Sequence, residues 1–164
     1  MCIRDRLKRM EKEQKHSLAN DIAEHVKLQQ QYDSLYNQSM TILNSLPVAV
    51  AVYNAEGKIL YFNERFCRIF GTDMEEMAES HPNIYDSPVV TDEIKNAIKA
   101  GLPIFTSFPY DFGKVDGYIT TVYTGIRHLE CNGQPIRNPN GELASYVIIM
   151  EDITESLEKE EMLR

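Results

Sequence analysis

The chain has 164 residues, 43% of them hydrophobic, and a formal net charge of −8. This length suits one domain of ordinary size with some additional helix, and the apolar content is enough for a core. The acidic balance argues against nucleic acid as a partner, because such a partner needs a basic surface. No apolar run approaches the ~18 residues of a membrane-spanning helix, and three widely spaced cysteines favour a reducing cytoplasm over a disulfide framework.

The first expected element is a long helix over residues 7–46, which contain neither Gly nor Pro, whereas residues 1–6 read as a non-native start. Apolar residues recur at spacings near three and four, which predicts an amphipathic, coiled-coil-like helix. At ~1.5 Å per residue it would be about 60 Å long, too long for a small domain to bury. We therefore expect a homodimer, with docking of the helix on its own domain as the alternative. The seam of the dimer would include Leu28, Tyr32, Leu35 and Ile42.

After Pro47 the pattern changes to short elements with caps and turns between them. Asn63 and Thr91 are candidate helix caps, and Gly71 and Gly101 are candidate helix ends. In chain order the expected elements are strands 48–53 and 58–62, helix 64–70, short helical turns over 73–90, a helix over 91–101, and strands 104–112, 118–131 and 143–151.

The first and last of these strands are almost wholly apolar, which indicates that both of their faces are covered. We therefore place them in the middle of the sheet. Neighbouring strands pair antiparallel across short connections. The predicted fold class is α+β, a five-stranded antiparallel sheet with short helices on one face, preceded by the long helix.

Three stretches, at the separations found here, resemble the PAS sensor domains of bacterial signalling proteins. They run from Ile42 to Tyr53, from Gly57 to Phe66, and from Gly141 to Glu155. The middle of the chain, with Tyr110-Asp-Phe before a long strand, is similar to PAS domains in sensor histidine kinases of Bacteroidetes-type bacteria. The resemblance implies a PAS domain over residues 47–153, a dimeric habit and a role in signal relay, in a fragment that lacks the kinase core.

A short polar motif occupies the point where the last strand gives way to a helix over residues 154–164. It consists of Asp152, Ile153 and Thr154, with Glu151 before it. The resemblance implies that this motif joins the sheet to a following coiled coil and an output domain. A carboxylate and a hydroxyl at such a junction can bond backbone groups left unpaired there. We expect a relay role for these residues, with an ordinary helix cap as the alternative.

A ligand pocket is a further expectation, with the alternative that its residues only fill the core. Haem is not expected, because the helix over 91–101 has no histidine to serve as the axial ligand. Flavin is not expected either, since Cys67 lies on an earlier helix than the one that light-sensing relatives use. His128 and Cys131 are three apart on a strand and so face opposite ways, which argues against a metal site. The expected cofactor is none or an unknown small molecule, and the candidate pocket residues are Phe66, Ile69, Tyr85, Ile94, Ile98 and Tyr123.

The sequence thus predicts the sensing and relay module of a two-component sensor histidine kinase, with no catalytic residues of its own. A diguanylate cyclase or a transcriptional regulator would use the same module. The basic segment 4–15 fits the cytoplasmic flank of a membrane anchor in the parent protein, or an ordinary solvated helix face. A small α+β enzyme with Asp111 or His128 as general base is the distant alternative, but neither residue has an evident catalytic partner.

Overall fold

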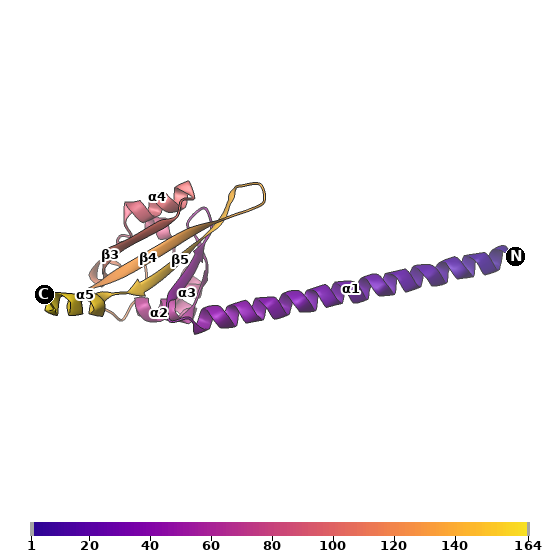
Figure 1. The fold of residues 1–164 in the computed structure, drawn as a ribbon, viewed down its shortest axis with the longest axis horizontal. Helices are drawn as coiled ribbons and strands as arrows, with labels where there is room; N and C mark the ends of the chain where they lie inside the picture. Colours follow the sequence, from indigo (N-terminus) through magenta and orange to yellow (C-terminus); the bar gives the residue numbers. More distant parts are fainter. Residues whose placement is uncertain (1, 164) are drawn as a thin grey trace. The chain divides into compact units, whose positions relative to one another are not determined.

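A computed structural model describes residues 2–163 as a long helix followed by a five-stranded sheet with short helices (Figure 1). Contacts within the chain divide it into two units, with the boundary between Ile42 and Leu43. Among the described residues, no helix combines the length and the apolar character that a membrane span needs.

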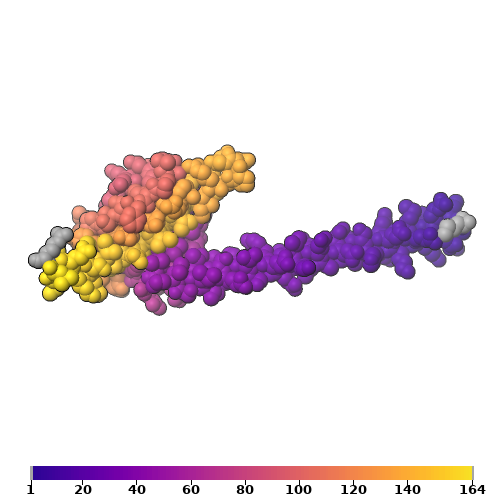
Figure 2. Space-filling view, viewed as in Figure 1, coloured from indigo at the N-terminus to yellow at the C-terminus, as the bar shows by residue number. Residues whose placement is uncertain are grey.

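The long helix, α1 (Ile3–Ser45), confirms the predicted helix and begins four residues before the expected position. Its 43 residues correspond to about 65 Å of helix. None of the α1 side chains is buried within this chain, and Figure 2 shows the side chains on one side of this helix in the indigo and purple part of the view. The helix ends just before Pro47, which cannot continue it.

The second unit is built on an antiparallel sheet in the order β2-β1-β5-β4-β3. The prediction that the two most apolar strands are central is confirmed, because β1 and β5 pair with each other in the middle. The elements are β1 (Ala49–Tyr53), β2 (Ile59–Phe62), α2 (Glu64–Phe70), α3 (Met74–Ser80), η1 (Ile84–Asp86), α4 (Asp92–Ala100), β3 (Ile104–Asp111), η2 (Phe112–Lys114), β4 (Ile126–Arg137), β5 (Leu143–Asp152) and α5 (Thr154–Met162).

Alternation along the strands gives the sheet one face that packs on the short helices. Tyr146, Ile148 and Met150 of β5 are buried in one cluster with side chains of α2, α3 and α4. The side chains between them point to the other face, where Ile149 is 36% exposed. The core therefore lies between the sheet and the short helices that cover this face (Figure 1).

Asn63 is the most extensively bonded side chain at the start of the domain. Its Oδ1 accepts from the backbone N–H of Phe66, as the predicted helix cap requires, and also from that of Val50. Its Nδ2 donates to the carbonyl oxygens of Leu43 and Val48 at 2.9 and 3.0 Å. The side chain is fully buried, so one residue joins the end of α1, strand β1 and helix α2.

The prediction of a strand over 118–131 is wrong in its first half, since β4 begins only at Ile126. Residues 121–123 instead bond the carboxyl end of α2. The Thr121 hydroxyl donates to the Phe70 carbonyl at 2.6 Å, the Val122 N–H to the Gly71 carbonyl, and the Tyr123 hydroxyl to the Arg68 carbonyl. The last carbonyls of a helix have no partner within the helix. These tertiary bonds outweigh the local preference of the segment for a strand.

Strand β4 also runs further than expected, through Gly133 and Pro135 to Arg137. Strand β3 pairs with β4 only as far as Gly133, so Pro135 has a single neighbouring strand, and a sheet tolerates proline there. A Cβ atom on Gly133 would lie 2.6 Å from the Tyr146 ring. Glycine is therefore required at position 133 for close packing against Tyr146. The β4–β5 hairpin projects past the other strands (Figures 1 and 2).

Candidate functional site

The junction between β5 and α5 is held to the neighbouring strand β4 by side-chain and backbone bonds. Asp152 Oδ1 accepts from the N–H of Thr154 at 3.0 Å and from its hydroxyl at 2.5 Å. Thr154 Oγ1 accepts from the N–H of His128 at 2.9 Å, and the N–H of Ile153 donates to the His128 carbonyl. Thr154, the first residue of α5, is thereby bonded both to Asp152 at the end of β5 and to His128 of β4.

Arg127 completes this junction as the ionic partner of Asp152. Its Nη1 lies 3.0 Å from Asp152 Oδ2. Partial burial alone would raise the pKa of Asp152, but the hydrogen bonds from Thr154 and the Arg127 guanidinium outweigh burial and lower that pKa. The carboxylate is therefore charged at neutral pH, as this set of bonds requires.

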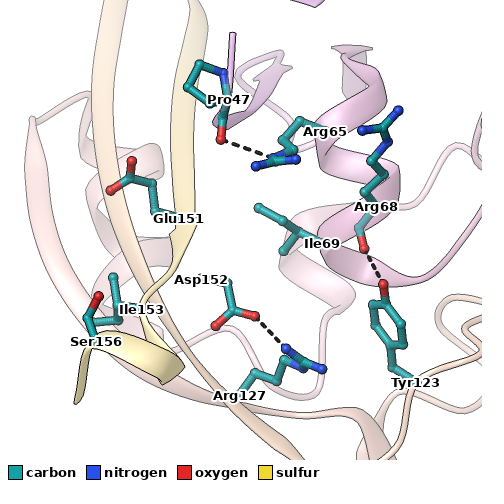
Figure 3. Close-up of a pocket in the computed structure, with 10 residues that line it drawn as sticks. All are labelled: Pro47, Arg65, Arg68, Ile69, Tyr123, Arg127, Glu151, Asp152, Ile153 and Ser156. Atoms are coloured by element: carbon teal, nitrogen blue, oxygen red, sulfur yellow. Dashed lines mark hydrogen bonds and ion pairs between the residues drawn. The ribbon is translucent and has the colours of Figure 1, made fainter. Parts of the chain in front are cut away.

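A cavity of about 400 Å³ opens beside the junction, between α2 and the ends of β4 and β5 (Figure 3). Arg65, Arg68 and Ile69 reach it from α2, while Arg127 and Asp152 reach it from the sheet. Its remaining lining residues are Pro47, Tyr123, Glu151, Ile153 and Ser156. Glu151 and Asp152 belong to the predicted relay motif, so the motif forms one wall of this cavity.

A line of aromatic rings connects the core to the same junction. Phe70 and Tyr110 have ring centroids 5.1 Å apart, Tyr110 and Phe112 4.9 Å, and Phe112 and Tyr123 5.5 Å. The Arg127 guanidinium lies 5.4 Å from the centroid of the Tyr123 ring, within cation–π distance. Contacts between packed rings thus run from a buried helix residue to the ionic partner of Asp152.

The interior itself is nearly filled. The void between the helices and the sheet has a volume of about 30 Å³ and is lined by apolar and tyrosine side chains, among them Tyr53, Phe66 and Tyr110. This volume has room for about one or two water molecules. Burial raises the pKa of Tyr53 and Tyr110 well above the usual value for tyrosine, with further contributions from neighbouring tyrosines, so both hydroxyls are neutral.

The structure distributes the six candidate pocket residues over four places. Phe66 lines the interior void, whereas Ile69 and Tyr123 line the junction cavity. Ile94 and Ile98 are fully buried in the core on α4. Tyr85 is half-buried near the β1–β2 turn, and its hydroxyl donates to the Ala55 carbonyl at 3.1 Å. The six residues therefore do not line a single pocket.

The four candidate dimer residues lie on the exposed surface of α1. Leu28, Tyr32, Leu35 and Ile42 are 61, 66, 64 and 59% exposed. Their spacing along a regular helix places them on one face, and their role in pairing two copies stays a prediction.

Arg127, His128 and the backbone at the start of β4 are the junction residues that sequence reasoning missed. The alternating segment before them predicted a strand that begins at residue 118. With that start, nothing in the sequence indicated that residues 127 and 128 lie at the beginning of β4, beside Asp152. Gly125, with a φ of 81°, marks the true start, because that conformation favours glycine and interrupts a strand.

The described part of the chain offers few groups suited to reactive-cysteine, metal or acid–base chemistry. Cys67 and Cys131 are buried, which raises the pKa of their thiols to about 11 and about 12. No group of three or more metal-ligating side chains occurs among residues 2–163. Asp111 Oδ1 accepts from the N–H of Gly113 in a local turn, and His128 is exposed on β4.

Comparison with known proteins gives one family and several similar folds. A family model described as "PAS domain" matches residues 47–155. A nitrogen fixation regulatory protein of Klebsiella oxytoca is 26% identical over 141 residues, and these cover 84% of this chain but only 26% of that protein.

Two solved structures illustrate the likeness in fold. An RNA-binding light-oxygen-voltage receptor has a TM-score of 0.61 at 21% identity, over 79% of this chain and 36% of that one. A PAS domain from a two-component sensor histidine kinase has a TM-score of 0.55 at 13% identity, over 74% of this chain and 98% of that one. At these identities the likeness concerns the fold alone.

Proposed function

This chain belongs to the PAS domain family, and from that premise we propose that it is the sensing and relay module of a two-component sensor histidine kinase. A change in the interior, or where two copies pair, reaches an output domain through α5. The module itself has no catalytic residues, and phosphotransfer belongs to the output domain. It works in the cytoplasm, whether or not the parent protein is anchored in the inner membrane, and it uses no cofactor or an unknown small molecule.

The observation that carries this proposal is the double attachment of the β5–α5 junction. Asp152 and Thr154 bond each other within the junction, and Arg127 and His128 bond them from β4. A displacement of β4 along β5 moves both Arg127, which bonds Asp152, and His128, which bonds Thr154 at the start of α5. Small shifts at such a contact can move a packed helix between discrete positions.

Pairing of two copies through α1 is the second part of the proposal. The apolar seam residues are exposed within the single chain, and a helix of this length with an exposed apolar stripe is typical of a coiled coil. We expect Leu28→Asp with Leu35→Asp to shift the sedimentation equilibrium from dimer to monomer. Gln30→Asp, which adds one negative charge on the opposite face of α1, leaves the dimer intact if the seam is correct.

The test of the kinase proposal is autophosphorylation of the protein encoded by the full reading frame. The expected output domain contains a phosphorylated histidine, and its rate of phosphate incorporation should change at least severalfold in Asp152→Ala. Asp116→Ala, which removes an exposed carboxylate far along the chain from the junction, is the matched control. A wild-type rate in Asp152→Ala, with normal folding, would reject the relay role of the junction.

The 26% identity to a nitrogen fixation regulatory protein supports a second candidate, the PAS module of a transcriptional regulator or of a diguanylate cyclase. The downstream reading frame separates the two. A His-Glu-x-Arg-x-Pro segment supports the kinase, whereas a DNA-binding domain supports a transcriptional regulator, and a Gly-Gly-Asp/Glu-Glu-Phe segment supports a diguanylate cyclase.

A further inference from the structure

The junction cavity has a charge that differs from that of the whole chain. The protein carries a net charge of −8, yet three arginines line this one cavity against two carboxylates. They reach it from both sides, Arg65 and Arg68 from α2 and Arg127 from β4 (Figure 3). Arginine is suited to binding carboxylates and phosphates because its planar group offers five N–H donors in a fork.

Most of these donors are not used within the described chain. Arg65 is half-buried, donates through Nε to the Pro47 carbonyl at 3.0 Å, and forms no ion pair with any described residue. Arg68 has Glu64 at 4.0 Å as its ionic partner, and both of these side chains are more than 60% exposed. A pair of this kind contributes little and is easily exchanged for another anion.

The rest of the lining is partly apolar. Ile69 and Ile153 are half-buried, and Pro47 also lines the cavity. The volume of about 400 Å³ is within the range of small-molecule sites, and much larger than an inorganic ion requires. A ligand that matches both parts of the lining has an anionic head and a small apolar body.

We propose that this cavity binds a small organic anion, with a carboxylate or phosphate head at Arg127, an apolar body against Ile69 and Ile153, and the positive charges of Arg65 and Arg68 on the opposite side of the cavity (Figure 3). The head competes with Asp152 for the Arg127 guanidinium. Binding therefore loosens the Asp152–Arg127 pair, which is a direct input to the junction that does not pass through the domain interior.

The test is titration of the 164-residue chain with phenyl phosphate, benzoate and benzyl alcohol, followed in proton–nitrogen correlation spectra. We expect saturable shifts of the Arg65 Nε–H signal and of the Ile69 and Ile153 amides with at least one anion, and none with benzyl alcohol. Comparison of the two anions separates a phosphate head from a carboxylate head. Absence of saturation with both anions, or equal shifts with benzyl alcohol, overturns the proposal.

Charge-removing variants locate the binding site. Arg65→Gln and Arg68→Gln should each weaken binding severalfold, because each removes a positive charge from the wall opposite Arg127. Lys114→Gln removes one positive charge outside the cavity and should leave the affinity unchanged. Arg65 also bonds Pro47, so if Arg65→Gln unfolds, the exposed Arg68 still tests the site.

Two further outcomes would overturn the proposal. One is equal weakening in Lys114→Gln, which would indicate a diffuse charge effect. The other is a set of shifts that follows protein concentration rather than added anion, since a second copy of the chain would then fill the cavity. The titration needs no output domain, so its failure leaves the kinase proposal standing, and failure of the kinase proposal leaves the anion site standing.

Discussion

The interior of the domain and its β5–α5 junction differ in the volume of their cavities and in the charge of the side chains that line them. The interior void measures about 30 Å³ and is surrounded by aromatic and aliphatic side chains. The junction cavity measures about 400 Å³ and is lined by three arginines and two carboxylates. Close packing makes the interior costly to change, whereas bonds between half-exposed charges are weak and exchangeable. The comparison indicates that stability resides in the first region and adjustability in the second.

The two regions are nevertheless physically connected. The rings of Phe70, Tyr110, Phe112 and Tyr123 are in contact from α2 to the junction, and the last of them lies beside Arg127. We therefore expect a rearrangement of the packed interior to displace Arg127, the ionic partner of Asp152. Substitutions in each region, and the reactivity of the cysteines, should show whether the interior is the tighter of the two.

Truncation in the interior should have the largest effect. Ile148 is fully buried on β5, between Ala51 and Gly133 of the flanking strands. Ile148→Ala is expected to lower the free energy of unfolding by about 2–5 kcal/mol, because it leaves a cavity that the sheet cannot fill. Ile149→Ala, on the other face of the same strand, should cost distinctly less. Equal losses in urea denaturation would mean that the inner face is not the tighter one.

Asn63→Ala should be the next most damaging change. It leaves the carbonyls of Leu43 and Val48 and the N–H groups of Val50 and Phe66 without their side-chain partner. We expect a loss of about 1–3 kcal/mol in the free energy of unfolding, since unsatisfied buried polar groups carry that penalty. Asn63→Asp keeps both acceptor roles but not the donations, so it should recover the cap without restoring full stability. Urea denaturation measures these losses, and an Asn63→Ala variant as stable as the wild type would contradict the structural role of Asn63.

Replacement of Asp152 should have a small effect that depends on pH. Because the folded-state pKa is below the usual value of 3.8, the charged carboxylate stabilises the fold above that value, and the contribution is lost as the pH falls through the folded-state pKa. Asp152→Asn should therefore cost below about 1 kcal/mol at neutral pH. The gap between wild type and variant should close under acid conditions, as measured by urea unfolding from pH 7 to pH 2. A gap that widens in acid would show that the pKa is raised.

The reactivity of the three cysteine thiols should distinguish the buried interior from the exposed surface, without any substitution that changes stability. Burial raises the pKa of the Cys67 and Cys131 thiols to about 11 and about 12, whereas Cys2 is exposed. Only the thiolate reacts rapidly, so native protein should be labelled quickly by a maleimide at one of its three cysteines. Labelling of all three should follow in urea. Rapid labelling of Cys67 in the native state would show that the interior opens readily.

Local patterns in the sequence determined much of this fold. The absence of Gly and Pro predicts α1, the apolar runs place β1 and β5 at the centre of the sheet, and Asn63 and Thr91 cap the helices where expected. Each of these features depends on residues close together in the chain. The polar motif at Asp152 was also visible for the same reason.

Tertiary structure alone decided where β4 begins, how the candidate pocket residues divide, and what bonds Asp152. The segment 121–123 alternates like a strand but bonds the end of α2 instead. Arg127 reaches Asp152 because the register of β4 on β5 places Leu129 opposite Asp152. Register between distant strands depends on the packing of the whole sheet and on bonds across it. For this reason the identity of the junction motif was readable in the sequence, whereas its partners and the cavity beside it were not.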